Sequence, residues 1–303
     1  MNTTVPGAPA SQIRRFLFEA LDIRGAVVQL TDVWQALQAG REMAPAVARV
    51  LGELTATTVV IAGNLKQPGR LTVQLHGDGD AAHPLRLAVV DCSHDLNVRA
   101  LARLNEAADA RFATPSADAV DLAALIGSGR LQLALDAPSM REPYISLVPL
   151  AGDSIASNFE HYLAQSEQQP AALFLAASAD AAAALFLQRL PGADQRDADG
   201  WTRVTTLAQT VKDEELLTLS PLQLLTRLFS EEDLRLFDPR AVRHDWPEDR
   251  AKIGAMLLSL GEAEVRRILA EHGEVRVQDD LSNHDYHFSA ADIDALFAAP
   301  PSA

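Results

Sequence analysis

The chain has 303 residues, of which 48% are hydrophobic, 41 are acidic, 26 are basic and one is a cysteine. This length favours about two domains, and the hydrophobic fraction suffices for an ordinary buried core, which excludes a wholly disordered or collagen-like chain. The formal charge of −15 opposes binding to phosphate backbones and to anionic lipid, so we expect proteins or small molecules as partners, with no nucleic acid and no membrane.

The first half of the chain predicts several strands and one long apolar helix. Residues 26–30 predict a strand, and Thr31 offers an N-cap for a helix that reaches Leu37. Residues 45–62 are apolar on nearly every side, which predicts a central helix buried between two layers. Further predicted elements are strands over 71–75, 85–91, 130–135 and 144–150, and a helix over 154–165 that is capped by Asp153.

The composition changes at Asp194, where a polar loop precedes a strongly helical segment over residues 205–237. Two helices are predicted there, separated at Ser220-Pro221, because Ser caps a helix and Pro fits its first position. Beyond Asp238-Pro239 we expect a separate small unit. It contains helices over 250–260 and 262–271, a hairpin with strands over 274–277 and 286–288, and a last helix over 290–297.

Taken in order, several segments resemble the heat-shock protein 33 (HslO) family of redox-regulated holdase chaperones. The segments that carry the resemblance are residues 15–25, 71–79, 162–170, 212–219, 228–239 and 268–275. The resemblance implies an α+β fold with a layered β/α/β core domain over 1–193, a helical linker over 194–237 and a C-terminal module over 238–303. It also implies two strands within 171–190, where the alanine content alone would favour a helix.

In this family, four cysteines arranged as CxC and CxxC bind zinc, and oxidation releases the metal. The resemblance places these positions on Trp246, Glu248, Asp279 and Ser282, none of which is a cysteine. We therefore expect no cofactor, zinc included, and a conventional apolar core in the C-terminal module, with an unfolded module as the alternative. The expected core contains Trp246 with Leu257, Leu260, Val265, Ile268, Leu269, Val277, Leu281, Tyr286, Phe288, Ile293 and Phe297.

Two further groups of residues suggest chemistry. Asp279, His284, Asp285 and His287, with His244 and Asp245, offer ligands for another divalent metal, against the simpler interpretation of a polar hairpin tip. Cys92 and His94 suggest a cysteine nucleophile, against a strand end that is followed by a polar turn. No glycine-rich phosphate loop is present in the sequence.

These observations favour a cytoplasmic, ATP-independent holdase that is not an enzyme. Its partners would be unfolded or aggregation-prone client proteins, bound through apolar surface, with a monomer and a homodimer both open as the active form. Without a thiol switch, any regulation would come from marginal stability of the helices over 205–237, with constitutive activity as the alternative. The alternatives are a hydrolase or thiol sensor that uses Cys92, and an adaptor that has lost chaperone activity.

Overall fold

The structure, a computed structural model, describes residues 10–65, 67–105, 121–148, 150, 152–166 and 168–298. The chain divides by its internal contacts into two units, Met1–His244 and Asp245–Ala303. The first unit contains two hydrophobic clusters and the second contains one. Each unit therefore has apolar packing of its own.

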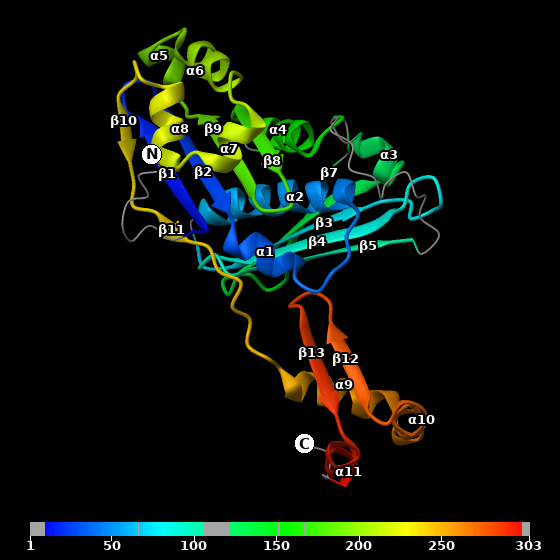
Figure 1. Cartoon of the computed structure of the whole chain (residues 1–303). Helices are drawn as coiled ribbons and strands as arrows, with labels where there is room; N and C mark the ends of the chain where they lie inside the picture. Colours follow the sequence, from blue (N-terminus) through cyan, green and yellow to red (C-terminus); the bar gives the residue numbers. More distant parts are fainter. Residues whose placement is uncertain are drawn as a thin grey trace. The chain divides into compact units, whose positions relative to one another are not determined.

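The first unit is built on two antiparallel sheets (Figure 1). One has the strand order β10-β1-β2-β9-β8, with β11 also paired to β1, and the other has the order β5-β4-β3-β6-β7. The strands of the first sheet are β1 (Gln12–Phe18), β2 (Ile23–Leu30), β8 (Ala171–Ala177), β9 (Ala182–Arg189), β10 (Leu234–Leu236) and β11 (Arg240–Ala241). Those of the second are β3 (Arg70–His76), β4 (Leu85–Ser93), β5 (Val98–Leu104), β6 (Arg130–Asp136) and β7 (Tyr144–Val148).

A long helix, α2 (Pro45–Gly63), lies between the two sheets and contacts strands of both. At Gly52 the helix approaches the first sheet closely, since a Cβ there would lie 2.7 Å from the Cβ of Ala177. Among the described residues, α2 is the one helix long and apolar enough to cross a membrane, and 78% of that apolar window is buried in the protein. The predicted β/α/β layering with a buried central helix is confirmed.

Short helices complete the first unit. Helices α1 (Asp32–Gln38), α3 (Leu122–Ile126) and α4 (Ile155–Ser166) contribute buried side chains to the cluster around α2. Helices α6 (Gly200–Ala208), α7 (Asp213–Thr218) and α8 (Pro221–Leu228) follow the four-residue α5 (Ala193–Arg196) and cover the opposite face of the first sheet. This sheet is therefore buried on both faces.

Over its described residues, 245–298, the second unit consists of three helices and a hairpin (Figure 1). Its elements are α9 (Arg250–Leu260), α10 (Glu262–His272), β12 (Val275–Asp279), β13 (His284–Phe288) and α11 (Ala290–Ala298). These follow the predicted order, with ends that differ by at most two residues from those expected. The hairpin is antiparallel and pairs Val275 with Phe288 and Asp279 with His284.

Some predicted elements differ from those observed. The two strands within 171–190 are confirmed as β8 and β9. Of the two helices predicted over 205–237, the one before Ser220 is divided into α6 and α7, and the one that begins at Pro221 ends at Leu228. Residues 234–236 form β10 and pair with the edge of β1. Strand β5 was not predicted from its pattern. At the start of α4, the Ser154 hydroxyl, and not Asp153, accepts the N–H of Ser157, at 3.1 Å.

Candidate functional site

The four positions that correspond to zinc ligands lie in two parts of the second unit. Trp246 and Glu248 lie in the irregular segment before α9. Asp279 ends β12, and Ser282 lies in the turn that leads to β13. With a single cysteine among the 303 residues, these positions provide no thiolate, so the four-thiolate site of the family cannot form within this chain.

The hairpin tip is hydrogen-bonded by the side chain that occupies the first CxxC position. The Asp279 carboxylate accepts the backbone N–H of Leu281 at 3.1 Å and that of Ser282 at 3.4 Å, while the N–H of Asn283 donates to the Asp279 carbonyl at 2.8 Å. Burial raises the pKa of Asp279, but hydrogen bonds from Ser282 and Leu281 outweigh it and leave the pKa below its ordinary value. The ionised carboxylate thus satisfies the turn directly.

Apolar side chains join the helices of the second unit to the hairpin. The cluster contains Ile253, Leu257, Val265, Val275, Tyr286, Phe288 and Ile293, with Ile268, Leu269, Val277, Leu296 and Phe297 packed against it. Polar contacts add to this packing: the Asp249 N–H donates to the Tyr286 hydroxyl at 2.8 Å, and the Arg250 guanidinium lies 4.1 Å from the centre of the Phe288 ring. These two contacts attach the start of α9 to strand β13.

Three residues of the predicted core are not in this cluster. Trp246 is half-buried in the irregular segment that precedes α9, and the elements that form the cluster begin only at Arg250. Leu260 is 50% exposed at the end of α9, and Leu281 is half-buried in the hairpin turn. The prediction that Trp246 belongs to this core is therefore wrong.

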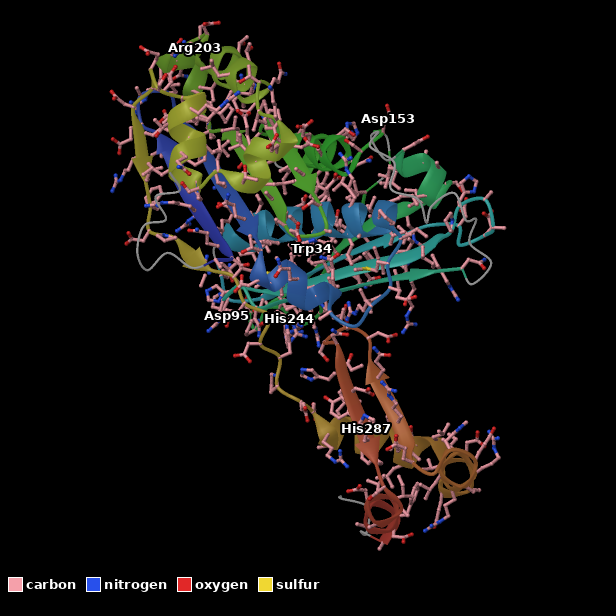
Figure 2. All side chains as sticks on the ribbon, viewed as in Figure 1. Trp34, Asp95, Asp153, Arg203, His244 and His287 are labelled. Carbon is pink, nitrogen blue, oxygen red and sulfur yellow. The ribbon has the colours of Figure 1, made fainter. Side chains whose placement is uncertain are left out.

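The predicted metal cluster of the hairpin does not come together. In the antiparallel pair, successive residues point to opposite faces, so Asp279 and His284 share one face while Asp285 and His287 share the other. Asp285 pairs with Arg276, with Nε 2.9 Å from Oδ1. His287, labelled in Figure 2, has its Nδ1 3.2 Å from Glu274 and its Nε2 3.5 Å from Asp285, whereas the His284 ring lies against Tyr286. His244 belongs to the first unit, where its Nδ1 lies 2.8 Å from the Val98 carbonyl oxygen.

One group of carboxylates and a histidine with closely spaced ligand atoms occurs elsewhere in the described part of the chain. Asp78, Asp80 and His83 follow β3. Asp78 and Asp80 are exposed, and Asp80 is already engaged with the N–H groups of Ala82 and His83. This group has the features of a hydrogen-bonded polar turn.

Cys92 lies in the main hydrophobic cluster and is fully buried, and burial raises the pKa of its thiol well above the ordinary value. Its sulfur lies 3.5 Å from the carbonyl oxygen of Ser93. His94 is exposed in the turn that follows β4. A cysteine nucleophile or thiol sensor requires an accessible, activated thiolate. The arrangement at Cys92 provides neither property.

Three exposed large apolar side chains lie on β7, as three others do on α9; β7 pairs with β6 and, among the described residues, ends its sheet. Tyr144, Ile145 and Leu147 are 59%, 57% and 64% exposed, and Met140 nearby is 39% exposed. An edge strand offers unpaired backbone groups together with its side chains. The sequence predicted this strand but not its exposure.

A second apolar surface is covered by α6, α7 and α8. On the sheet it consists of Phe16, Phe18, Ile23, Val27, Leu185 and Leu187, and the covering side chains include Val204, Leu216, Leu224, Leu225 and Phe229. The Phe18 and Phe229 rings meet edge to face, 5.0 Å apart. Arg203, labelled in Figure 2, joins α6 to the adjoining segments through Asp197 at 3.0 Å and Glu232 at 2.6 Å. The helices therefore cover an apolar sheet face.

Comparison with known proteins agrees with these features. A sequence model of the family described as Hsp33 protein matches residues 11–289. The 33 kDa chaperonin of Methylobacillus flagellatus is 36% identical over 95% of this chain and 94% of its own length, and that of Chromobacterium violaceum is 39% identical over 94% and 93%. A crystal structure of the Thermotoga maritima 33 kDa chaperonin (heat shock protein 33 homolog) shares the fold, with a TM-score of 0.75, 21% identity and coverage of 95% of this chain and 98% of its own. The chain belongs to the Hsp33 family of chaperones.

Proposed function

We propose that this chain is an ATP-independent holdase that binds aggregation-prone segments of unfolding proteins in the cytoplasm. We further propose that neither zinc nor thiol oxidation switches it. The observation that carries the second point is the second unit, where an apolar cluster joins the helices to the hairpin and Asp279, at a position that corresponds to a zinc ligand, hydrogen-bonds the hairpin tip. The buried Cys92 thiol adds support, because oxidants act on accessible thiolates.

Exposed apolar surface on β7 is the proposed site of client capture in the resting protein. Tyr144, Ile145 and Leu147 can bury client side chains, and the edge of the strand that no other described strand pairs with can pair with an extended client backbone. This mode has little sequence specificity, because main-chain hydrogen bonds provide part of the affinity. It suits a protein that captures many unfolding chains.

The helices α6 to α8 are the proposed regulatory element. They are short, and their stability depends on packing against the sheet rather than on their own length. Heat that detaches them would expose Phe16, Phe18 and their neighbours, which enlarges the apolar surface available to clients. Activation would then depend on temperature and not on redox state.

Light scattering from a heat-denatured client tests this proposal. The purified protein is expected to suppress the scattering equally with and without peroxide, since no accessible thiol responds. The double variant Ile145→Lys, Leu147→Lys is expected to weaken suppression, because charge on an edge strand opposes strand addition. Suppression that requires peroxide would contradict the absence of a thiol switch, and absence of suppression at any temperature would contradict the holdase function.

A further inference from the structure

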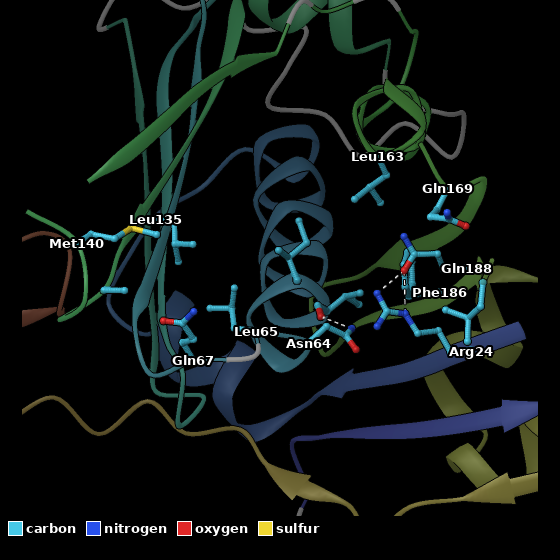
Figure 3. Close-up of a pocket in the computed structure, with 14 residues that line it drawn as sticks. Arg24, Asn64, Leu65, Gln67, Leu135, Met140, Leu163, Gln169, Phe186 and Gln188 are labelled. Carbon is cyan, nitrogen blue, oxygen red and sulfur yellow. Dashed lines mark hydrogen bonds between the residues drawn. The ribbon is translucent and has the colours of Figure 1, made fainter. Parts of the chain in front are cut away.

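A cavity of about 480 Å³ opens between the two sheets of the first unit, near the end of α2 (Figure 3). This volume lies in the range of about 300–1,000 Å³ that is typical of ligand sites. Its walls are mainly apolar and include Ile61, Leu135, Leu163 and Phe186. A polar group lies among them and consists of Arg24, Asn64, Gln67, Gln169 and Gln188.

The cavity exists because the helix is shorter than the sheets that enclose it. Helix α2 ends at Gly63, while β2 and β9 continue. On β2 the side chains of Ala26 and Val28 face the cluster around α2, and Arg24 lies on the same face by the alternation of a strand. Its cross-strand partner is Gln188, two residues after Phe186. The inward-facing side chains of β2 and β9 thus end in a polar pair, Arg24 and Gln188.

The Arg24 charge is not neutralised within the described structure. Its Nε donates to Gln188 Oε1 at 2.8 Å, its Nη2 donates to the same oxygen, and Gln188 is 1% exposed. Among residues 10–65, 67–105 and the other described ranges, no carboxylate forms an ion pair with this guanidinium. A guanidinium has five donors and prefers a carboxylate. The cavity is therefore complementary to an apolar molecule that carries one carboxylate.

The carboxamide side chains of Asn64 and Gln67 favour a peptide over a fatty acid as the molecule that carries the carboxylate. Asn64 donates through Nδ2 to the Val60 carbonyl at 2.8 Å, which leaves its oxygen as an acceptor, and Gln67 Oε1 accepts the Ser139 hydroxyl at 3.0 Å, which leaves its NH₂ group as a donor. Peptide groups need both kinds of partner, whereas a fatty-acid chain pairs with neither.

We propose that this cavity binds the C-terminal segment of an unfolded polypeptide, with the terminal carboxylate on Arg24 and apolar side chains against the walls. This inference rests on the proposed holdase function and assigns a distinct client site to it. Capture would not depend on the sequence of the client beyond an apolar end, because carboxamides and a guanidinium recognise the backbone and the terminal charge.

Fluorescence anisotropy with a short labelled peptide that ends in apolar residues tests this inference on the full chain. The free-acid peptide is expected to bind roughly ten- to a hundredfold more tightly than its C-terminal amide, as expected for loss of hydrogen bonds to a charged group. Arg24→Gln should abolish this preference, and Arg24→Lys, which keeps the charge, should retain part of it. The matched control is Arg86→Gln, which removes a charge from an exposed position on β4 and should retain the full preference.

Equal binding of acid and amide to the wild-type protein or to Arg24→Lys would overturn the assignment, as would an unchanged preference in Arg24→Gln. Decanoate that displaces the peptide only in proteins that keep Arg24 supports the shared carboxylate site. Decanoate that binds there when the peptide does not would show a fatty-acid site and overturn the peptide assignment. Suppression of client aggregation is measured in parallel, so that failure of the holdase function is distinguished from failure of this site.

Discussion

Replacement of Phe288 by alanine tests whether apolar packing alone stabilises the second unit. Phe288 is 4% exposed in β13 and belongs to the cluster that joins the hairpin to the helices. Truncation of a buried phenylalanine costs about 3–5 kcal/mol. At about 0.05–0.15 kcal/mol per residue, the unit Asp245–Ala303 has a stability of about 3–9 kcal/mol. The substitution is therefore expected to remove much of it.

Hydrogen exchange with mass spectrometry reads this loss locally. Amides of β12 and β13 exchange through opening of the unit, so their protection reports its free energy of unfolding. We expect protection to fall by roughly 100- to 5,000-fold in Phe288→Ala. Leu258→Ala, on α9 of the same unit and 44% exposed, is the matched control and should change stability by at most about 0.5 kcal/mol.

Addition of a chelator provides the contrasting result. If packing stabilises the unit, protection of β12 and β13 in the wild-type protein stays the same with and without chelator. Protection that survives Phe288→Ala but collapses when metal is removed would refute this reasoning, because the cluster would then contribute little compared with a bound ion.

Three further predictions concern the first unit. Burial raises the pKa of Glu53 above its ordinary value of 4.5, although Arg49 opposes the shift. The folded chain therefore binds this proton more tightly than the unfolded chain, and the free energy of unfolding falls as pH rises from 4.5 through the raised pKa. Urea melts of Glu53→Gln should lack that decline. Leu225→Ala should cost about 2–5 kcal/mol and lower the temperature at which client capture begins, whereas Leu222→Ala, 45% exposed on the same helix, should change neither melting nor scattering. Cys92 should resist alkylation in the native protein and react after denaturation; rapid native labelling, seen by mass spectrometry, would contradict its burial.

The sequence was most informative where one pattern had one structural solution. The apolar residues over 45–62 could be buried only between layers, and α2 lies between two sheets. The alanine-rich segment over 171–190 was ambiguous, because alanine favours helices while its burial here comes from sheet pairing. Residues 234–236 are strand for the same reason: their pairing partner, β1, lies more than 200 residues earlier in the chain.

The candidate sites were harder to predict, because they depend on which faces are covered. The hairpin residues Asp279, His284, Asp285 and His287 are close in sequence, but alternation along the strands divides them between two faces, with Asp279 and His284 on one and Asp285 and His287 on the other. The size of Trp246 predicts a core position, yet this residue precedes the elements that form the cluster. Arg24 and Gln188 are 164 residues apart, and only the register of β2 with β9 brings them together.

The central claim is that the second unit folds without a metal, on apolar packing and the hydrogen bonds of its hairpin. The most direct test is the metal content of the full chain, purified without chelator after expression in zinc-supplemented medium. The account predicts zinc and other divalent metals far below one ion per chain. A stoichiometric ion that remains bound through purification would contradict it.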